Sequence, residues 1–124
     1  MTADDAEDAI YVASVLRLYA DLPDTPWRPS ATDQALARRL HQEAVPLSLV
    51  ESALLLGTWR RLARADDLPP LPRIRSLAYF LPVVAELQMQ PLPAGYLDYL
   101  RLKLHKLAKA SRPTVQKSTF SDER

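Results

Sequence analysis

Arginine and lysine side chains are the groups in this chain that are best placed to bind an anion. Arg60, Arg61 and Arg64 follow one apolar segment, and Arg73 and Arg75 come after a short Pro-rich stretch. A guanidinium group pairs in a bidentate manner with phosphate or carboxylate. A cationic run nearer the C-terminus completes the set of residues expected to contact a polyanion: Arg101, Lys103, Lys106 and Lys109.

Charge is distributed unevenly along the chain, although the formal net charge is only +1. Residues 1–25 hold six acidic residues and one arginine, whereas residues 94–124 hold seven Lys or Arg and three acidic residues. A basic surface attracts polyanions, and about five or six phosphate contacts give nucleic-acid binding a steep salt dependence. We therefore expect contact with nucleic-acid backbone phosphate. One alternative stays open, in which these cations are solvated and pair with the acidic N-terminus.

No motif in the sequence specifies a reaction. The chain has no Cys, and it lacks a Walker glycine loop, an HExxH helix and a GxSxG elbow. His41 and His105 fall on different expected helices, so we interpret both as surface histidines rather than metal ligands. The acidic run at residues 4–8 is interpreted as the complement of a positive helix end rather than a divalent-cation site. We predict a protein that is not an enzyme and has no metal and no cofactor.

Composition favours an all-α fold. The chain has 11 Pro but only 2 Gly, and its apolar fraction of 48% is rich in Leu and Ala. Leu and Ala favour helices, whereas the tight turns of sheets depend on glycine. We expect a compact bundle of about five helices with Pro-rich connectors. It forms one domain over residues 1–112, followed by a disordered, basic C-terminal tail over residues 113–124.

The spacing of apolar residues places these helices along the chain. The expected helices cover residues 5–21, 32–45, 46–65, 76–89 and 94–110. The third is apolar nearly all round, so it should lie at the centre of the bundle. Gly57 within it implies close approach by another helix, because glycine costs about 1 kcal/mol there. Pro82 should kink or split the fourth helix.

Residues 33–56 have the apolar spacing of a helix-turn-helix unit. Ala44 stands where a turn glycine is common, and the early polar residues of the second helix are Ser48, Glu51 and Ser52. None of them is an Arg, Asn or Gln that would read base edges. We therefore interpret this segment as an ordinary helical hairpin rather than a base-reading unit.

Residues 45–87 resemble the helical domain of DnaD-like primosome proteins and of phage and plasmid replication proteins. The likeness lies in VPLSLVESALLLGTWRRL, a Pro-rich connector and IRSLAYFLPVVAEL. Residues 50–54 match the first helix of that family, and residues 79–84 match the second. The chain departs from the family at Pro82, and it lacks the aromatic residue that commonly closes the second helix. The resemblance implies a non-catalytic, DNA-associated assembly module that often self-associates, and it transfers no individual site residue.

Two functions remain open at this point. The first is a small accessory protein of the replication or mobile-element type, which contacts backbone phosphate and recruits a protein partner or a second copy of itself. The second is a protein–protein interaction module, or a small subunit of a larger complex, with no nucleic-acid contact. The apolar runs are far shorter than the roughly 20 residues of a membrane span. The acidic start carries no secretory signal, so we expect a cytoplasmic protein without membrane contact.

Overall fold

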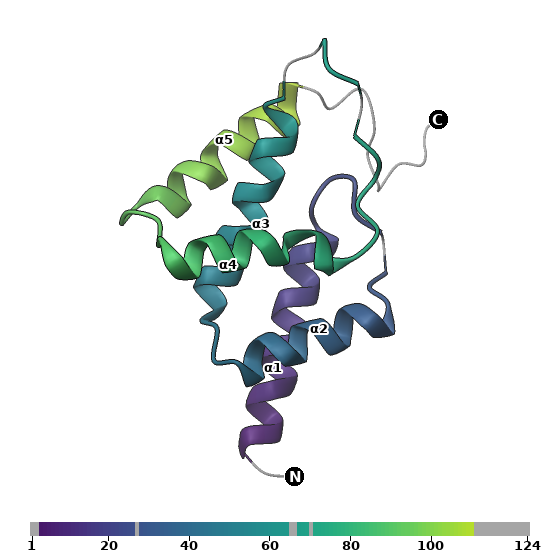
Figure 1. The fold of residues 1–124 in the computed structure, drawn as a ribbon, viewed down its shortest axis with the longest axis vertical. Helices are drawn as coiled ribbons and strands as arrows, with labels where there is room; N and C mark the ends of the chain where they lie inside the picture. Colours follow the sequence, from purple (N-terminus) through teal and green to yellow (C-terminus); the bar gives the residue numbers. More distant parts are fainter. Residues whose placement is uncertain (1–2, 27, 65–66, 70, 111–124) are drawn as a thin grey trace.

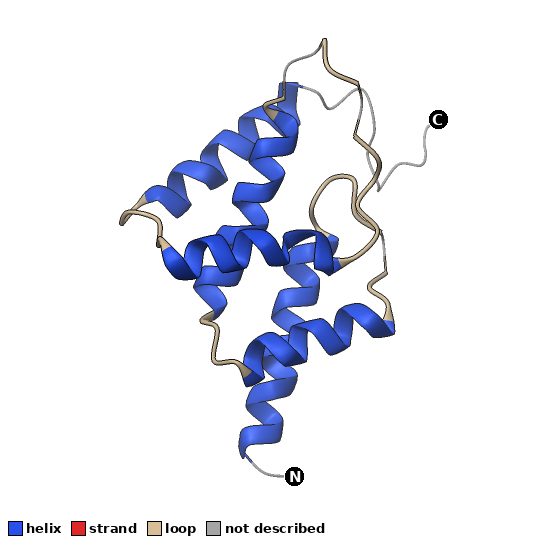
Figure 2. Cartoon of the chain, in the orientation of Figure 1, coloured by secondary structure: helices blue, strands red, loops and turns tan. Residues whose placement is uncertain are grey.

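The computed structural model describes residues 3–26, 28–64, 67–69 and 71–110. Within these ranges the chain forms five α-helices, one short 3-10 helix and no strand (Figures 1 and 2). The expected all-α fold is confirmed. The expected tail over residues 113–124 lies outside the described residues.

The observed helices begin and end within about three residues of the expected positions. They are α1 (Ala3–Ala20), α2 (Ala31–Gln42), α3 (Leu47–Leu62), η1 (Leu77–Phe80), α4 (Leu81–Met89) and α5 (Tyr96–Ala110). The fourth expected helix is split, as Pro82 predicted. Pro82 occupies the first turn of α4, where its missing N–H leaves no hydrogen bond unmade.

Helix α3 is the centre of the packing, as its all-round apolar character predicted. It contacts α1, α4, α5 and η1, while α2 packs against α1 and η1. In Figure 1, α1, α3 and α5 rise in broadly the same direction, and α2 and α4 run across them. The largest fully buried side chains include one from each of four of these elements: Tyr19, Leu54, Phe80 and Leu100.

Helices α2 and α3 do not form the expected hairpin, because they do not pack along each other. The cause is the turn between them. Ala44 adopts the left-handed conformation (φ 60°), its N–H donates to the carbonyl of His41, and the N–H of Val45 donates to that of Leu40. This is the helix ending that glycine usually provides. The Tyr11 hydroxyl then holds the turn on α1 by donating to the Val45 carbonyl at 2.7 Å.

A buried carboxylate joins the start of α2 to η1. Asp33 is 1% exposed, and its side chain accepts from the backbone N–H of Ser30 at 2.8 Å and of Leu77 at 2.9 Å. The Ser30 hydroxyl accepts in return from the Asp33 N–H at 3.1 Å, which completes a capping box. Two segments that lie 44 residues apart in the sequence are therefore fixed by one side chain.

Gly57 is the point of closest approach in the core, as expected. A Cβ built at this position would lie 2.8 Å from Cδ1 and 2.9 Å from Cε1 of Phe80. Phe80 is 1% exposed, so its ring has no free space to move into. The approaching group is thus a side chain of η1, at the junction with α4.

We predict that Gly57→Ala destabilises the protein, although alanine is the better helix former. The added methyl group overpacks the contact with Phe80, which should lower the free energy of unfolding by about 1–3 kcal/mol. Urea denaturation measures the change. In a Phe80→Leu background the same substitution should cost clearly less, since the ring atoms that it meets are gone. An equal cost in both backgrounds would contradict the proposed contact.

A second prediction concerns the strained turn. Ala44→Gly should raise the free energy of unfolding by up to about 1 kcal/mol, because the left-handed conformation costs a residue with a Cβ roughly 1–2 kcal/mol. Ala35→Gly is the matched control, since Ala35 is exposed within α2. It should lower stability by about 1 kcal/mol. Destabilisation by both substitutions would refute the strain at Ala44.

Candidate nucleic-acid interface

The basic segments named by the sequence come together at one end of the molecule. In Figure 1 the C-terminal ends of α3 and α5 lie side by side, and the N-terminal end of α1 lies at the opposite end of the long axis. Helix α3 ends in Arg60 and Arg61, with Arg64 just beyond it, and α5 carries Lys103 and Lys106 toward the same end. Basic residues also suit the negative ends of two helices.

Arg60 is held by a carboxylate of α4. Its Nη1 and Nη2 atoms donate to the two oxygens of Glu86 at 2.8 and 2.6 Å, which is the bidentate geometry. The hydrogen bond from Arg60 holds the pKa of Glu86 below its usual value. Arg60 is therefore already matched to an anion within the protein.

Arg61 has a structural role. Its side chain is only 8% exposed, and Nη2 lies 2.9 Å from the Pro72 carbonyl and 3.4 Å from the Asp24 carboxylate. Nη1 donates to the Tyr79 hydroxyl at 3.3 Å, and the guanidinium carbon lies 5.3 Å from the centre of the Tyr79 ring. Arg61 thus ties the loop after α1, the connector before η1 and η1 itself to the end of α3.

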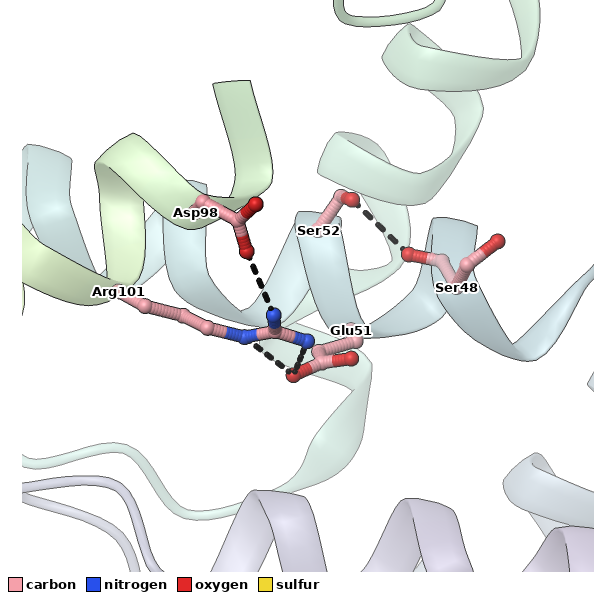
Figure 3. Close-up of polar contacts among 5 residues, drawn as sticks. All are labelled: Ser48, Glu51, Ser52, Asp98 and Arg101. Carbon is pink, nitrogen blue, oxygen red and sulfur yellow. Dashed lines mark hydrogen bonds and ion pairs between the residues drawn. The ribbon is translucent and has the colours of Figure 1, made fainter. Parts of the chain in front are cut away.

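Arg101 fixes α5 to the N-terminal half of α3 (Figure 3). Its Nε and Nη2 atoms donate to one oxygen of Glu51 at 3.2 and 2.8 Å, and Nη1 donates to Asp98 at 2.9 Å. The hydrogen bond to Glu51 is the main reason that the pKa of Arg101 is raised. Two carboxylates therefore neutralise this guanidinium on the face where α5 meets α3.

Arg73 and Arg75 remain exposed on the connector. They flank Ile74, which is 3% exposed and whose N–H donates to the Asp24 carbonyl at 2.9 Å. In an extended segment successive side chains point to opposite sides, so burial of Ile74 directs both guanidinium groups to solvent. Neither forms an ion pair with a carboxylate in the part of the chain that the structure describes.

The other cations at the α3–α5 end contact neutral groups. Arg64 donates to the Pro69 carbonyl at 3.1 Å, and the Lys103 Nζ atom lies 5.7 Å from the centre of the Tyr99 ring. Lys106 is exposed on α5. Like Arg73 and Arg75, these three have no ion pair with any described carboxylate. We refer to the five together as the candidate cations: Arg64, Arg73, Arg75, Lys103 and Lys106.

The nine residues expected at the interface therefore divide into three groups. Arg60, Arg61 and Arg101 are committed to carboxylates, and the five candidate cations are not. Lys109 belongs to α5, but its side chain lies outside the described residues. The sequence had left open pairing with the acids of residues 1–25, and Arg61 does pair with Asp24. The carboxylates that hold Arg60 and Arg101 come instead from α3, α4 and α5.

The acidic start of α1 is itself paired, with α2. Asp8 contacts His41 Nδ1 at 2.9 Å and Arg38 Nε at 3.2 Å, and the His41 ring lies 4.6 Å from that of Tyr11. The hydrogen bond with His41 is the main cause that lowers the pKa of Asp8. The sequence interpretation missed this cluster, because its members lie about 30 residues apart and no local pattern connects them.

His105 does not join that cluster, since it is exposed on α5. Within the described ranges no three His, Asp or Glu side chains are grouped in a way that could hold a metal ion. No described helix has both the length and the apolar character required to cross a membrane.

Comparisons with protein-family models, with curated proteins and with solved structures found no match. The resemblance to DnaD-like replication proteins therefore stays a prediction from residues 45–87.

We predict that Asp8 makes the protein sensitive to acid. A carboxylate whose pKa is lower in the folded state stabilises the fold above its unfolded pKa, and this contribution is lost as the pH falls through the folded pKa. Asp8→Asn should therefore lower the melting temperature near pH 7, and the difference from the wild type should vanish at strongly acidic pH. Thermal denaturation across this range measures the effect.

Glu7→Gln is the matched control for that experiment. Glu7 is exposed in the same turn of α1 and forms no ion pair with a described residue. Its substitution should leave the pH profile close to that of the wild type. A difference in melting temperature between Asp8→Asn and the wild type that does not change with pH would contradict the role of the Asp8 ion pairs.

Proposed function

We propose that this chain is a small, non-catalytic helical accessory protein that contacts nucleic-acid backbone phosphate, of the replication or mobile-element type that the resemblance implies. The single observation that carries the proposal is the group of five candidate cations. They form no ion pair with a described carboxylate, while neighbouring arginines of the same helices do. Cations without an internal anion are the ones that can neutralise phosphates and so release the counterions condensed on a nucleic acid.

The paired arginines are not expected to contribute. A phosphate that bound Arg60 or Arg101 would have to displace a carboxylate already held by two hydrogen bonds. Charge-assisted bonds of this kind are roughly twice as strong as neutral ones. The proposed contacts are therefore fewer than the nine residues named by the sequence. They come from α5, from Arg64 just after α3 and from the connector, and Figure 1 shows α5 and the connector on opposite sides of α3.

The number of phosphate contacts predicts how strongly nucleic-acid binding depends on the salt concentration. Five phosphate contacts on duplex DNA give a slope of about −4.5 for the logarithm of the binding constant against the logarithm of the salt concentration. A fourfold rise in salt should then weaken binding roughly 500-fold. Retention on heparin should collapse over the same range.

A protein–protein interaction module is the second candidate, and exposed apolar side chains favour it. Met89 is 87% exposed, Ile10 66%, Leu102 52% and Tyr99 45%. Single exposed apolar residues are normal on a protein surface, whereas contiguous patches mark interfaces. Among these four, Tyr99 and Leu102 lie one turn apart on α5, and Ile10 and Met89 lie on other helices. The support for this candidate therefore comes from α5.

Variants that remove two candidate cations at a time test the proposed function directly. Lys103→Gln with Lys106→Gln should reduce the salt slope by about 2, since each lost phosphate contact removes about 0.9. Arg73→Gln with Arg75→Gln should have a similar effect. Fluorescence anisotropy with a labelled duplex at several salt concentrations measures the slope.

The matched control removes the same amount of charge from paired residues. Arg60→Gln with Arg101→Gln should leave the slope near its wild-type value, and circular dichroism should show that each variant is folded. No binding at low salt would refute the proposal. Equal losses in the control and in the lysine pair would show that binding follows overall charge rather than the candidate cations. A stable oligomer without nucleic-acid binding would favour the interaction module.

A further inference from the structure

We propose that the outer face of α5 binds unpaired bases by stacking on Tyr99, so that the preferred ligand is single-stranded nucleic acid. This inference rests on the proposed function and specifies its ligand class. It comes from one stripe of side chains on α5, in which exposed aromatic and apolar residues stand beside the lysines. Phosphate contacts alone do not explain these apolar residues.

The stripe combines an aromatic ring with cations at helical spacing. Tyr99, Leu102, Lys103 and Lys106 stand at positions i, i+3, i+4 and i+7, which places them on one face of the helix. Tyr99 is 45% exposed and Leu102 is 52% exposed, whereas Leu100 on the opposite face is fully buried. Helix α5 packs mainly on α3, so its outer face has no covering helix among the described residues.

The Tyr99 ring contacts a second aromatic ring and lies beside a cation. Its centre lies 5.3 Å from that of Tyr96 at an interplanar angle of 31°, and Tyr96 packs against the core. The Lys103 Nζ atom lies 5.7 Å from the ring centre. A ring held by a half-buried neighbour loses little conformational freedom when a base stacks on it.

This arrangement suits a single strand better than a duplex. In a duplex the bases are already stacked and paired, and the phosphates alone are presented to a helix flank. In a single strand, aromatic side chains stack with exposed bases while lysines follow the backbone, and this mode tolerates any sequence. Base-edge readers such as Arg, Asn or Gln are not required for it, and the start of α3 offers none.

Tyr79 provides an internal comparison. Its ring is 43% exposed, close to the value for Tyr99. Yet Arg61 lies over it at 5.3 Å, and its centre lies 5.1 Å from that of Phe80 in an edge-on arrangement. Both rings therefore have an aromatic neighbour and a cation, and the difference lies in the cation. Arg61 is 8% exposed and held by the Pro72 carbonyl, whereas Lys103 forms no ion pair with a described carboxylate and is free to follow a phosphate.

The test compares one short mixed-sequence DNA strand, free of self-complementarity, with the same strand annealed to its complement. Tyr99→Leu should weaken binding of the single strand about fivefold or more and leave duplex binding nearly unchanged. Tyr99→Phe should retain wild-type affinity, since stacking needs the ring and not the hydroxyl. Tyr79→Leu, the matched control, should not change the ratio of the two affinities.

The outcomes separate this inference from the function on which it rests. Salt-dependent binding of both ligands that Tyr99→Leu leaves unaltered would overturn the stacking site and retain the phosphate contacts. No binding of either ligand at low salt would overturn both. A loss for Tyr99→Phe equal to that for Tyr99→Leu would also overturn stacking, because it would assign the effect to the hydroxyl. Quenching of Tyr fluorescence at saturating ligand should be smaller in Tyr99→Leu than in the wild type, since the other four tyrosines remain, and this readout does not depend on affinity.

Discussion

The contact between Gly57 and Phe80 is the constraint on which much of this structure depends. Because Gly57 has no Cβ, the Phe80 ring can rest directly on the backbone of α3. That contact fixes the junction of η1 and α4 against the central helix. Glu86, further along α4, then meets Arg60, and Tyr79 of η1 meets Arg61. The same segment therefore brings a carboxylate to Arg60, while the carboxylate that pairs with Arg61 comes from the α1–α2 loop.

Paired and unpaired cations have different physical roles in this chain. Arg61 and Arg101 act as cross-links, since each joins elements that are distant in the sequence through a planar fork of donors. Lys106 is exposed and Lys103 is partly exposed beside the Tyr99 ring, and neither pairs with a described carboxylate. A cationic sequence segment can therefore contain both internally paired and unpaired cations, and composition alone does not separate them.

Much of the fold was predictable from the sequence because its causes are local. Apolar spacing placed the helices, Pro82 marked the split between η1 and α4, and Gly57 marked a close approach. The pairing of side chains was not predictable. Arg101 and Glu51 lie 50 residues apart, and no periodic pattern encodes which carboxylate a given guanidinium will meet.

The α2–α3 hairpin was the wrong expectation, and its failure has a physical cause. At Ala44 the chain turns from α2, which runs across the molecule, into α3, which runs along it, and Tyr11 holds this turn on α1. A residue with a Cβ rarely adopts the left-handed conformation, so this turn is not expected at an alanine. The hydrogen bonds at the end of α2 and the contact with α1 compensate for the strain.

The shared direction of α1, α3 and α5 has a consequence for how a polyanion could approach. The backbone dipoles of α3 and α5 point the same way, so partial negative charge collects where these two helices end (Figure 1). A phosphodiester chain that approached along the helix axes would be repelled by this negative charge. A path across the side of α5, rather than onto its C-terminal end, avoids the carbonyl groups of the last turn. It also keeps lysine side chains between the nucleic-acid strand and the protein backbone.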